Sequence, residues 1–316
     1  MSLDHQALAE LCDLVSVATA CGPAVEWTNA RLPDWESRLV EDGFLLSVAP
    51  TGSPEDVRVL LVSHVDEIGG YALGEHPEGG CRAATIGAPP EAYGGRSLQA
   101  MDWRDPTGAS LRPLEARVVG DDLVIQASDL RPYETVFTYS EPTRIEDDWI
   151  HGKAIDPRLT AYAVVEAARR LADPAVAVML VFAEECSMHA AEKGAAYARR
   201  HLPGLRLVAN CDVPGLANIE GWGLEQCGIR ITERGRLMDP HAALSLHAEL
   251  RAAGVDIALG ASRTGSQTSL FIPQCRAVSL ALPAEEAHVT PTRAYLPALE
   301  TLIEGLMALP DTSAAR

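Results

Sequence analysis

Four short apolar segments, each followed closely by a carboxylate or an imidazole, constrain the fold of this chain most. The segments are rich in aliphatic residues and cover positions 57–63, 175–183, 205–211 and 277–282. Runs of this length between turn or helix signals are typical of buried strands in a parallel sheet. Open α/β sheets bind ligands outside the carboxyl ends of their strands, so the polar residues that follow are expected to meet in one crevice.

The polar residues at these strand ends form a set that suits divalent metals. They are His64 and Asp66 after the first segment, Glu184 and Glu185 after the second, Asp212 after the third and His288 after the fourth, and Asp156 joins them from the turn at 152–157. Imidazole nitrogens and carboxylate oxygens together suit zinc, cobalt or manganese better than calcium. The set predicts a hydrolase that holds two metal ions, with one of the adjacent glutamates acting as general base.

Each of these residues alone has a plainer interpretation. A solitary histidine such as His64 is more often structural, and paired acids such as Glu184 and Glu185 are also typical of a helix N-terminus. Asp212 precedes Pro214 and Gly215 in a pattern typical of a turn, and His288 fits a loop. The metal site is favoured because all of them fall at the same edge of one inferred sheet.

The pattern between the strands predicts an α/β fold with a mixed, largely parallel sheet and helices on both faces. Amphipathic helices are expected at 159–171, 190–200, 241–253 and 295–309, with a further strand at 255–259. Helices at 3–20 and around 32–41 are expected to lead into a strand at 44–48. Residues 71–150 are rich in Gly and Pro and lack helical periodicity, which predicts a small, inserted, β-barrel-like domain. Residues 1–70 and 151–316 would then form the catalytic domain.

Charge and composition narrow the partners of the protein. The 316 residues carry a formal net charge of −18, which disfavours nucleic acid and anionic membranes as partners. No apolar run reaches the length of a membrane span, and the first residues lack the features of an export signal. The seven cysteines are scattered without a paired motif, which disfavours a disulfide framework. A cytoplasmic protein is expected.

Several motifs together resemble a known family. The matching segments, in chain order, are His64-Val65-Asp66-Glu67-Ile68-Gly69, Gly152-Lys153-Ala154-Ile155-Asp156, Glu184-Glu185, Cys211-Asp212-Val213 and His288. In these motifs and in the insertion between the first two, the chain resembles the TET-type metallo-aminopeptidases, also called deblocking or glutamyl aminopeptidases and sometimes given the name endoglucanase. The resemblance implies that His64 and Asp212 complete one metal site, that Glu185 and His288 complete the other, and that Asp156 bridges both.

The resemblance also implies roles for the remaining residues and for partners. Glu184 would be the general base on the bridging water, and Asp66 would support His64. The cofactors would be two divalent ions, with zinc favoured and cobalt or manganese as alternatives. The substrates would be peptides shortened from the N-terminus, and the protein would be a homo-oligomer, as large as a dodecamer in many members of the family.

The chain departs from the family pattern at three places. At the first of these, Glu185 is followed by Cys186-Ser187 where the family has Val-Gly. Pro157 stands where the family has a second Asp, and an Asp156–Pro157 bond can adopt the cis isomer that tends to follow the bridging Asp in the family. The customary Gly-Thr-Asp-Ala stretch appears as Arg263-Thr264-Gly265-Ser266. These departures bear on substrate preference more than on metal binding.

Other functions stay open on the sequence alone. A carboxypeptidase or N-deacylase on the same scaffold would be favoured by an arginine, such as Arg263, that faces the site. A degenerate, non-catalytic homologue is suggested by the Asp-to-Pro departure. A glycoside hydrolase could use Glu184 and Glu185 as its carboxylate pair, but adjacent strand residues diverge and are poorly placed to flank one glycosidic bond.

Overall fold

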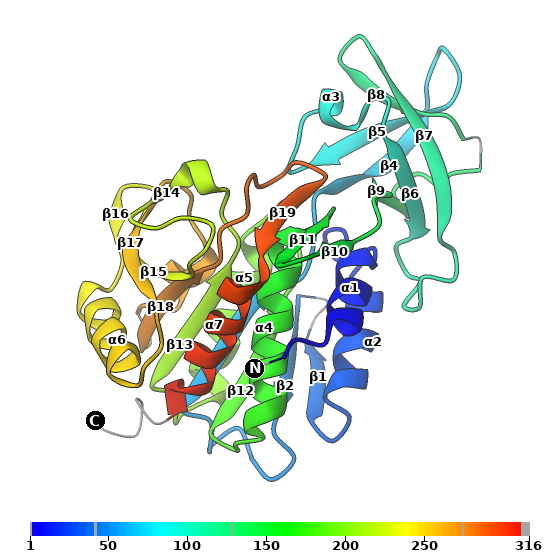
Figure 1. Ribbon diagram of the computed structural model, residues 1–316. Helices are drawn as coiled ribbons and strands as arrows, with labels where there is room; N and C mark the ends of the chain where they lie inside the picture. The colour runs from blue at the N-terminus through cyan, green and yellow to red at the C-terminus, as the bar shows by residue number, and fades with distance from the viewer. Residues whose placement is uncertain (1, 41–42, 128, 274, 311–316) are drawn as a thin grey trace.

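The protein consists of a large α/β part and a small β-barrel (Figure 1). The computed structural model describes residues 2–40, 43–127, 129–273 and 275–310. The large part is built on a mixed sheet with helices on both faces, so the predicted fold class is confirmed, including the small β-rich insertion. Among the described residues, no helix combines the length and the apolarity needed to span a bilayer.

The central sheet places four parallel strands at its middle. Ten strands are described, in the spatial order β1 (Glu36–Val40), β2 (Phe44–Val48), β12 (Val176–Val181), β3 (Val59–His64), β13 (Leu207–Asp212), β18 (Arg276–Ala281), β15 (Gly228–Glu233), β17 (Ala258–Ser262) and β14 (Ile219–Glu220), with β16 (Arg236–Leu237) paired to β15. Strands β12, β3, β13 and β18 run parallel to one another. Their carboxyl ends therefore lie at one edge of the sheet.

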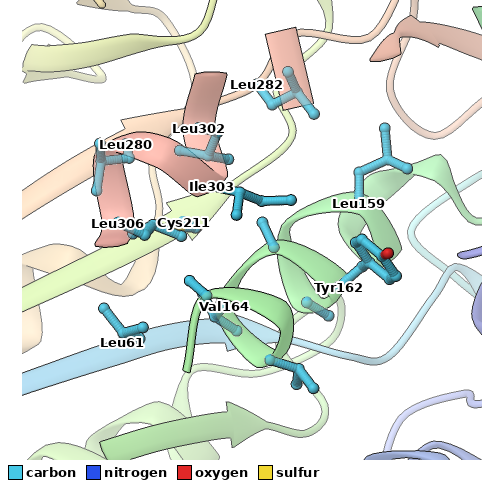
Figure 2. Close-up of a cluster of buried hydrophobic side chains, with 14 of the residues drawn as sticks. Leu61, Leu159, Tyr162, Val164, Cys211, Leu280, Leu282, Leu302, Ile303 and Leu306 are labelled. Carbon is cyan, nitrogen blue, oxygen red and sulfur yellow. The ribbon is translucent and has the colours of Figure 1, made fainter. Parts of the chain in front are cut away.

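Helices cover both faces of this sheet because its inner strands are apolar on both sides. In β3, Val59 and Leu61 belong to one core, and Leu60 and Val62 belong to the opposite one. The first core is covered by α1 (His5–Asp13), α2 (Gly22–Arg31), α4 (Ile155–Leu171), α6 (Pro240–Ala252) and α7 (Leu296–Met307), and the second by α5 (His189–His201) and the short helix η2 (Gln267–Leu270). Figure 2 shows Leu61, Cys211 and Leu280 of three neighbouring strands together with Leu159 and Val164 of α4 and Leu302, Ile303 and Leu306 of α7.

The barrel stands beyond the end of the sheet at which the parallel strands finish (Figure 1). It closes in the order β4 (Gly69–Glu75), β5 (Cys81–Ile86), β8 (Asp122–Ile125), β7 (Arg112–Val119), β6 (Ser97–Asp102) and β9 (Thr135–Tyr139), with the short helix α3 (Pro90–Tyr93) beside it. It has a core of its own, centred on Leu98, Leu123 and Phe137. A three-stranded sheet of β10 (Arg144–Glu146), β11 (Trp149–Gly152) and β19 (Thr292–Tyr295) joins the chain leaving the barrel to the C-terminal part.

Of the two helices expected near the N-terminus, the one around 32–41 is wrong in the described residues, and the one at 3–20 is only partly right. The region expected as a helix at 32–41 contains strand β1 instead, which pairs with β2 in antiparallel register, and position 41 lies outside the described residues. Pairing with a neighbouring strand overrides the local helical spacing here. The helix expected at 3–20 ends at Asp13. Beyond it, Ser16 and Val17 pair with the backbone of Glu67 at the start of the barrel, which removes them from any helix.

The strands near the far edge of the sheet were also harder to locate. The strand expected at 255–259 is β17 and begins three residues later, at Ala258. Strand β15 was not expected at all. It carries Arg230 and Glu233, both buried, and charged residues inside a strand hide its apolar pattern.

Candidate active site

The predicted site residues come together at the carboxyl edge of the parallel strands. His64 ends β3, Glu184 and Glu185 follow β12, Asp212 ends β13, Asp156 lies at the start of α4 and His288 lies in the loop between β18 and β19. These six residues line a cavity of about 200 Å³. Asp66 does not line the cavity and lies behind His64 and the two glutamates.

A larger hollow elsewhere on the molecule lacks this chemistry. It measures about 860 Å³ beside α1, α2 and α4, and no histidine or cysteine lines it. Its three arginines pair with Asp4 and Glu166. The smaller cavity is therefore the candidate active site.

Within the small cavity, the side chains form two groups that share Asp156. His64, Asp156 and Asp212 make one group and Asp156, Glu185 and His288 make the other, with one candidate ligand atom from each residue within 4.8 Å of the others in its group. His64 Nε2 lies 3.4 Å from Asp156 Oδ1 and 3.4 Å from Asp212 Oδ1. His288 Nε2 lies 3.1 Å from Glu185 Oε2 and 3.9 Å from Asp156 Oδ2. The two oxygens of Asp156 thus face different groups.

Asp156 is placed by the local backbone at the entrance to α4. Its angles, φ −86° and ψ 121°, are extended, although the residues after it are helical. The Asp156–Pro157 peptide is cis, as the sequence permits. The carboxylate therefore precedes the regular turns of α4 and lies over the end of the sheet.

Unpaired polar atoms show that this cluster fits divalent cations. Within the described residues, Asp156 Oδ1 and Glu185 Oε1 are buried and accept no hydrogen bond, which is costly for a carboxylate unless a cation offsets it. The donors are imidazole nitrogens and carboxylate oxygens, the combination that zinc, cobalt and manganese accept. The residues present therefore fit a pair of such ions.

The raised pKa values of the cavity glutamates also favour a bound cation. Burial, followed by the charge of Asp212, Glu185 and Asp66, raises the pKa of Glu184 to about 8 even though His64 acts to lower it. Burial raises the pKa of Glu185 to about 6, with Asp156 adding to the effect and His288 opposing it. These shifts reflect like charges held close together with little water, the environment that a bound cation relieves.

The pKa values of the two histidines are also raised, which for an imidazole favours the charged form. The hydrogen bond to Glu185 raises the pKa of His288 to about 10, although burial opposes it. Burial acts to lower the pKa of His64, but Glu184 and the three aspartates around the ring outweigh it, and the pKa rises well above 6.5. In the metal-free protein both imidazoles are therefore in the charged, doubly protonated form at pH 7.

Asp66 lies outside the cavity and contacts three of the residues that line it. Its carboxylate accepts hydrogen bonds from the backbone N–H groups of Glu184 at 2.9 Å and Glu185 at 3.1 Å, and it lies 3.5 Å from His64 Nδ1. Ala183, at the sharp turn before the glutamates, has a left-handed φ of 59°. Asp66 thus holds the Glu184–Glu185 turn as well as facing His64, and the spacing of the sequence predicted only the second contact.

The barrel contributes to the site through Gly87. His288 Nδ1 donates to the carbonyl oxygen of Gly87 at 2.8 Å, which leaves Nε2 directed at Glu185 and Asp156. Gly87 has a φ of 76°, and a Cβ there would lie 2.3 Å from the Ile68 side chain. Only glycine fits this position, so the contact between barrel and site is built into the backbone.

Sequence reasoning missed Arg230 and Glu233, which support Asp212. The fully buried Arg230 guanidinium lies 3.1 Å from Asp212 Oδ2, 3.0 Å from Glu233 Oε1 and 2.7 Å from Ser279 Oγ. Burial alone would raise the pKa of Asp212, but Arg230 holds it well below its usual range. The available signal was a pair of opposite charges within one short strand, Gly228–Glu233.

The arginine that lines the cavity is Arg234 and not Arg263, which the sequence offered as one example. Arg263 is exposed, pairs with Glu220 at 2.9 Å and does not line the cavity. Arg234, from the turn after β15, lines it together with Thr264 and Gly265. The 263–266 segment therefore reaches the cavity through its middle residues and not through Arg263.

The fold and the grouped side chains define a class of α/β proteins in which an inserted barrel stands beside the sheet edge. Solved structures with this fold include TET peptidases, other aminopeptidases and proteins named endoglucanase. The chain is similar to PhTET1 of Pyrococcus horikoshii, solved as a dodecamer, with 17% identity and a TM-score of 0.86 over 98% of this chain and 99% of that one. It is similar to the TET aminopeptidase of Thaumarchaeota archaeon SCGC AB-539-E09, with 15% identity and a TM-score of 0.82 over 98% of each chain.

A third similar structure is the aminopeptidase of Desulfurococcus kamchatkensis, with 14% identity and a TM-score of 0.80 over 98% of this chain and 96% of that one. No family model and no curated protein matches the sequence. The resemblance found in the motifs is therefore confirmed at the level of the fold.

Proposed function

We propose that the protein is a two-metal aminopeptidase. The observation that carries this proposal is the sharing of Asp156 between two groups of metal-binding side chains, with Glu184 in the same cavity. In this assignment His64 and Asp212 complete one metal site, and Glu185 and His288 complete the other. Zinc is the favoured ion, with cobalt or manganese as alternatives, since the donors mix nitrogen and oxygen.

The reaction assigned to the site is hydrolysis of an amide bond. When bound, a pair of divalent ions supplies Lewis acidity that polarises the scissile carbonyl and offsets the charge of the oxyanion. Glu184 is the general base: its carboxylate takes a proton from the attacking water as the O–C bond forms and delivers it to the leaving amine as the C–N bond breaks. Asp66 fixes the turn that carries Glu184 and holds the His64 ring in orientation.

A second candidate is an amide hydrolase that recognises a substrate carboxylate, such as a carboxypeptidase or N-deacylase. The specific observation in its favour is Arg234 in the cavity wall. A non-catalytic scaffold is disfavoured because the candidate ligands and Glu184 all line one cavity. A glycosidase is disfavoured because Glu184 and Glu185 are adjacent and are both held through their backbone N–H groups by Asp66.

We extend the proposal to organisation and partners. Residues 1–70 and 151–316 are proposed as the catalytic domain and residues 71–150 as the inserted domain, supported by the barrel of Gly69–Tyr139. Homo-oligomers, as large as a dodecamer, are proposed with peptides as substrates, supported by the dodecameric PhTET1. The cytoplasm is the proposed compartment, supported by seven cysteines that are all unpaired.

Metal content and turnover test the proposal together. Elemental analysis of the purified protein is combined with hydrolysis of a panel of amino-acyl anilides, with and without chelator. We expect about two equivalents of divalent metal and loss of activity in chelator. The Glu184→Gln variant should bind metal but lose activity at least about 100-fold, in line with general-base contributions.

Glu192→Gln is the matched control, because Glu192 is an exposed glutamate on the neighbouring helix α5 and lies outside the cavity. Its activity should equal that of the wild type. A protein that binds no metal after reconstitution would overturn the two-metal assignment. Full activity in Glu184→Gln would overturn the role of the base.

A further inference from the structure

The loop that carries His288 is fixed neither by regular structure nor by burial. It connects β18, which ends at Ala281, to β19, which begins at Thr292. His288 has a left-handed φ of 59°, a conformation that non-glycine residues adopt rarely. Its side chain is 44% exposed, whereas that of His64 is 4% exposed. Specific contacts must therefore hold His288 in place.

The hydroxyl of Thr292 closes this loop on itself. Thr292 Oγ1 accepts a hydrogen bond from the backbone N–H of Glu286 at 3.1 Å and donates one to the carbonyl oxygen of the same residue at 2.7 Å. Thr292 is buried, so water competes poorly for these two bonds. Among the described residues, no other group hydrogen-bonds to the backbone of residues 286–289.

The remaining contacts of the loop do not replace these two bonds. Arg293 pairs with Glu285 at 3.0 Å, but the pair is exposed, and exposed ion pairs contribute little. At the other end of the loop, the Gly87 carbonyl accepts from His288 Nδ1 at 2.8 Å. Thr292 thus fixes the base of the loop, and Gly87 contacts the ring that the loop presents.

The same loop carries a second buried threonine whose hydroxyl does not make such bonds. Thr290 lies two residues before Thr292 and is buried to the same extent. Its Oγ1 has no hydrogen-bond partner in the described part of the chain. The loop therefore offers an internal comparison between a bonded and an unbonded threonine hydroxyl.

We propose that Thr292 is a positioning residue for His288. Its hydroxyl sets the path of residues 286–288, so that the imidazole Nε2 lies 3.1 Å from Glu185 Oε2 and 3.9 Å from Asp156 Oδ2. The inference rests on the proposed two-metal site and adds to it a residue that is neither a proposed ligand nor part of the cavity wall. Loss of the hydroxyl should weaken binding of one of the two ions only.

The test measures zinc binding by the full chain in competition with a chelating dye. Thr292→Val keeps the branched shape of the side chain, suits a strand and removes both hydrogen bonds. We expect the affinity for one ion to fall about 10- to 100-fold, the usual effect of losing a group that orients a metal ligand. Thr292→Ser keeps the hydroxyl and should bind both ions as the wild type does. Thr290→Val is the matched control and should also bind both ions normally.

A double-variant cycle with His288→Ala separates positioning from a general structural effect. The ion whose affinity falls in His288→Ala identifies the site that contains this histidine. If Thr292 acts through His288, adding Thr292→Val to His288→Ala should cause no further loss of affinity. A further loss in the double variant, wild-type affinities in Thr292→Val, or an equal loss in Thr290→Val would overturn the proposal.

Failure of the inference is distinct from failure of the proposed function. If the wild type binds no metal, the two-metal assignment fails, and crystal structures of the metal-free wild type, Thr292→Val and Thr290→Val decide the role of Thr292. Displacement of His288 away from Glu185 in Thr292→Val alone supports that role. An imidazole that keeps its contact with Glu185 in Thr292→Val, or that moves equally in Thr290→Val, overturns it.

Discussion

The strongest prediction on stability concerns Glu67, which is buried between the barrel and the catalytic part. Its carboxylate accepts both from Lys153 Nζ, at 2.7 Å from either oxygen, and from Arg158 at 3.2 Å. It also accepts from Thr138 Oγ1 at 2.9 Å and Ser16 N at 3.2 Å. The change Glu67→Gln keeps the size of the side chain and removes its charge.

The size of the expected loss of stability follows from the burial of Lys153 and Arg158. The side chains of Lys153 and Arg158 are 1% and 0% exposed, so both charges lose a partner that water cannot replace. Breaking a buried ion pair from one side costs about 3–5 kcal/mol of unfolding free energy. Because Lys153 and Arg158 flank Asp156, the same change should also weaken metal binding by about 10-fold or more.

The dependence on pH has a definite sign. Burial lowers the pKa of Lys153 below 10.5 in the wild type, although Glu67 opposes this. In Glu67→Gln that opposition is lost, so the folded state binds fewer protons than the unfolded state over a wider range below pH 10.5. Stability of the variant should therefore rise with pH more steeply than that of the wild type.

Urea unfolding of metal-free protein at pH 6, 7.5 and 9 measures these effects. The matched control is Glu220→Gln, whose partner Arg263 lies at a similar distance, 2.9 Å, but whose pair is exposed, and it should cost at most about 1 kcal/mol. If Glu67→Gln costs no more than Glu220→Gln, or if its cost grows with pH, the reasoning about the buried triad is refuted.

Three more predictions concern the site and the scaffold. Arg230→Met should weaken zinc binding about 10- to 100-fold in competition with a chelating dye, because Asp212 loses its buried donor; unchanged affinity would contradict this. Loading metal at pH 7 should release about three protons, since His64 with its raised pKa, His288 with its pKa of about 10 and Glu184 with its pKa of about 8 must each lose one. Titration calorimetry in buffers of different ionisation heat counts the released protons. Equal heats of metal binding in all the buffers would contradict the predicted proton release. Burial acts to raise the pKa of Glu166, but its hydrogen bonds to two arginines outweigh burial and lower it. The ionised Glu166 therefore stabilises the folded state fully above about pH 4.5, and this stabilisation disappears as pH falls below that value. A Glu166→Gln variant should lose that part of the acid dependence in urea midpoints taken from pH 3 to 6, and an unchanged profile would count against the ion pairs.

The strand ends were readable from sequence because burial on both faces leaves a continuous apolar signal. Strand β12 is entirely apolar, and β3 and β13 each carry a single uncharged polar residue, Ser63 and Asn210, before their last residue, so the histidine and carboxylates at the strand ends stand out. Strand β15 gave no such signal, because Arg230 and Glu233 lie within it. The two charges pair with each other, but their other partners, Asp212 and Ser266, are distant in sequence, which local patterns cannot reveal.

For the site, too, some features follow from local sequence patterns and others depend on contacts between distant segments. The sequence determined the fold class, the candidate ligands and their convergence, because parallel strands bring their carboxyl ends to one edge. Only the tertiary structure decided that Arg234 and not Arg263 reaches the cavity, and that Gly87 of the barrel holds His288. Those contacts depend on the angles of single turns and on segments about 200 residues apart, for which the linear sequence carries no periodic signal.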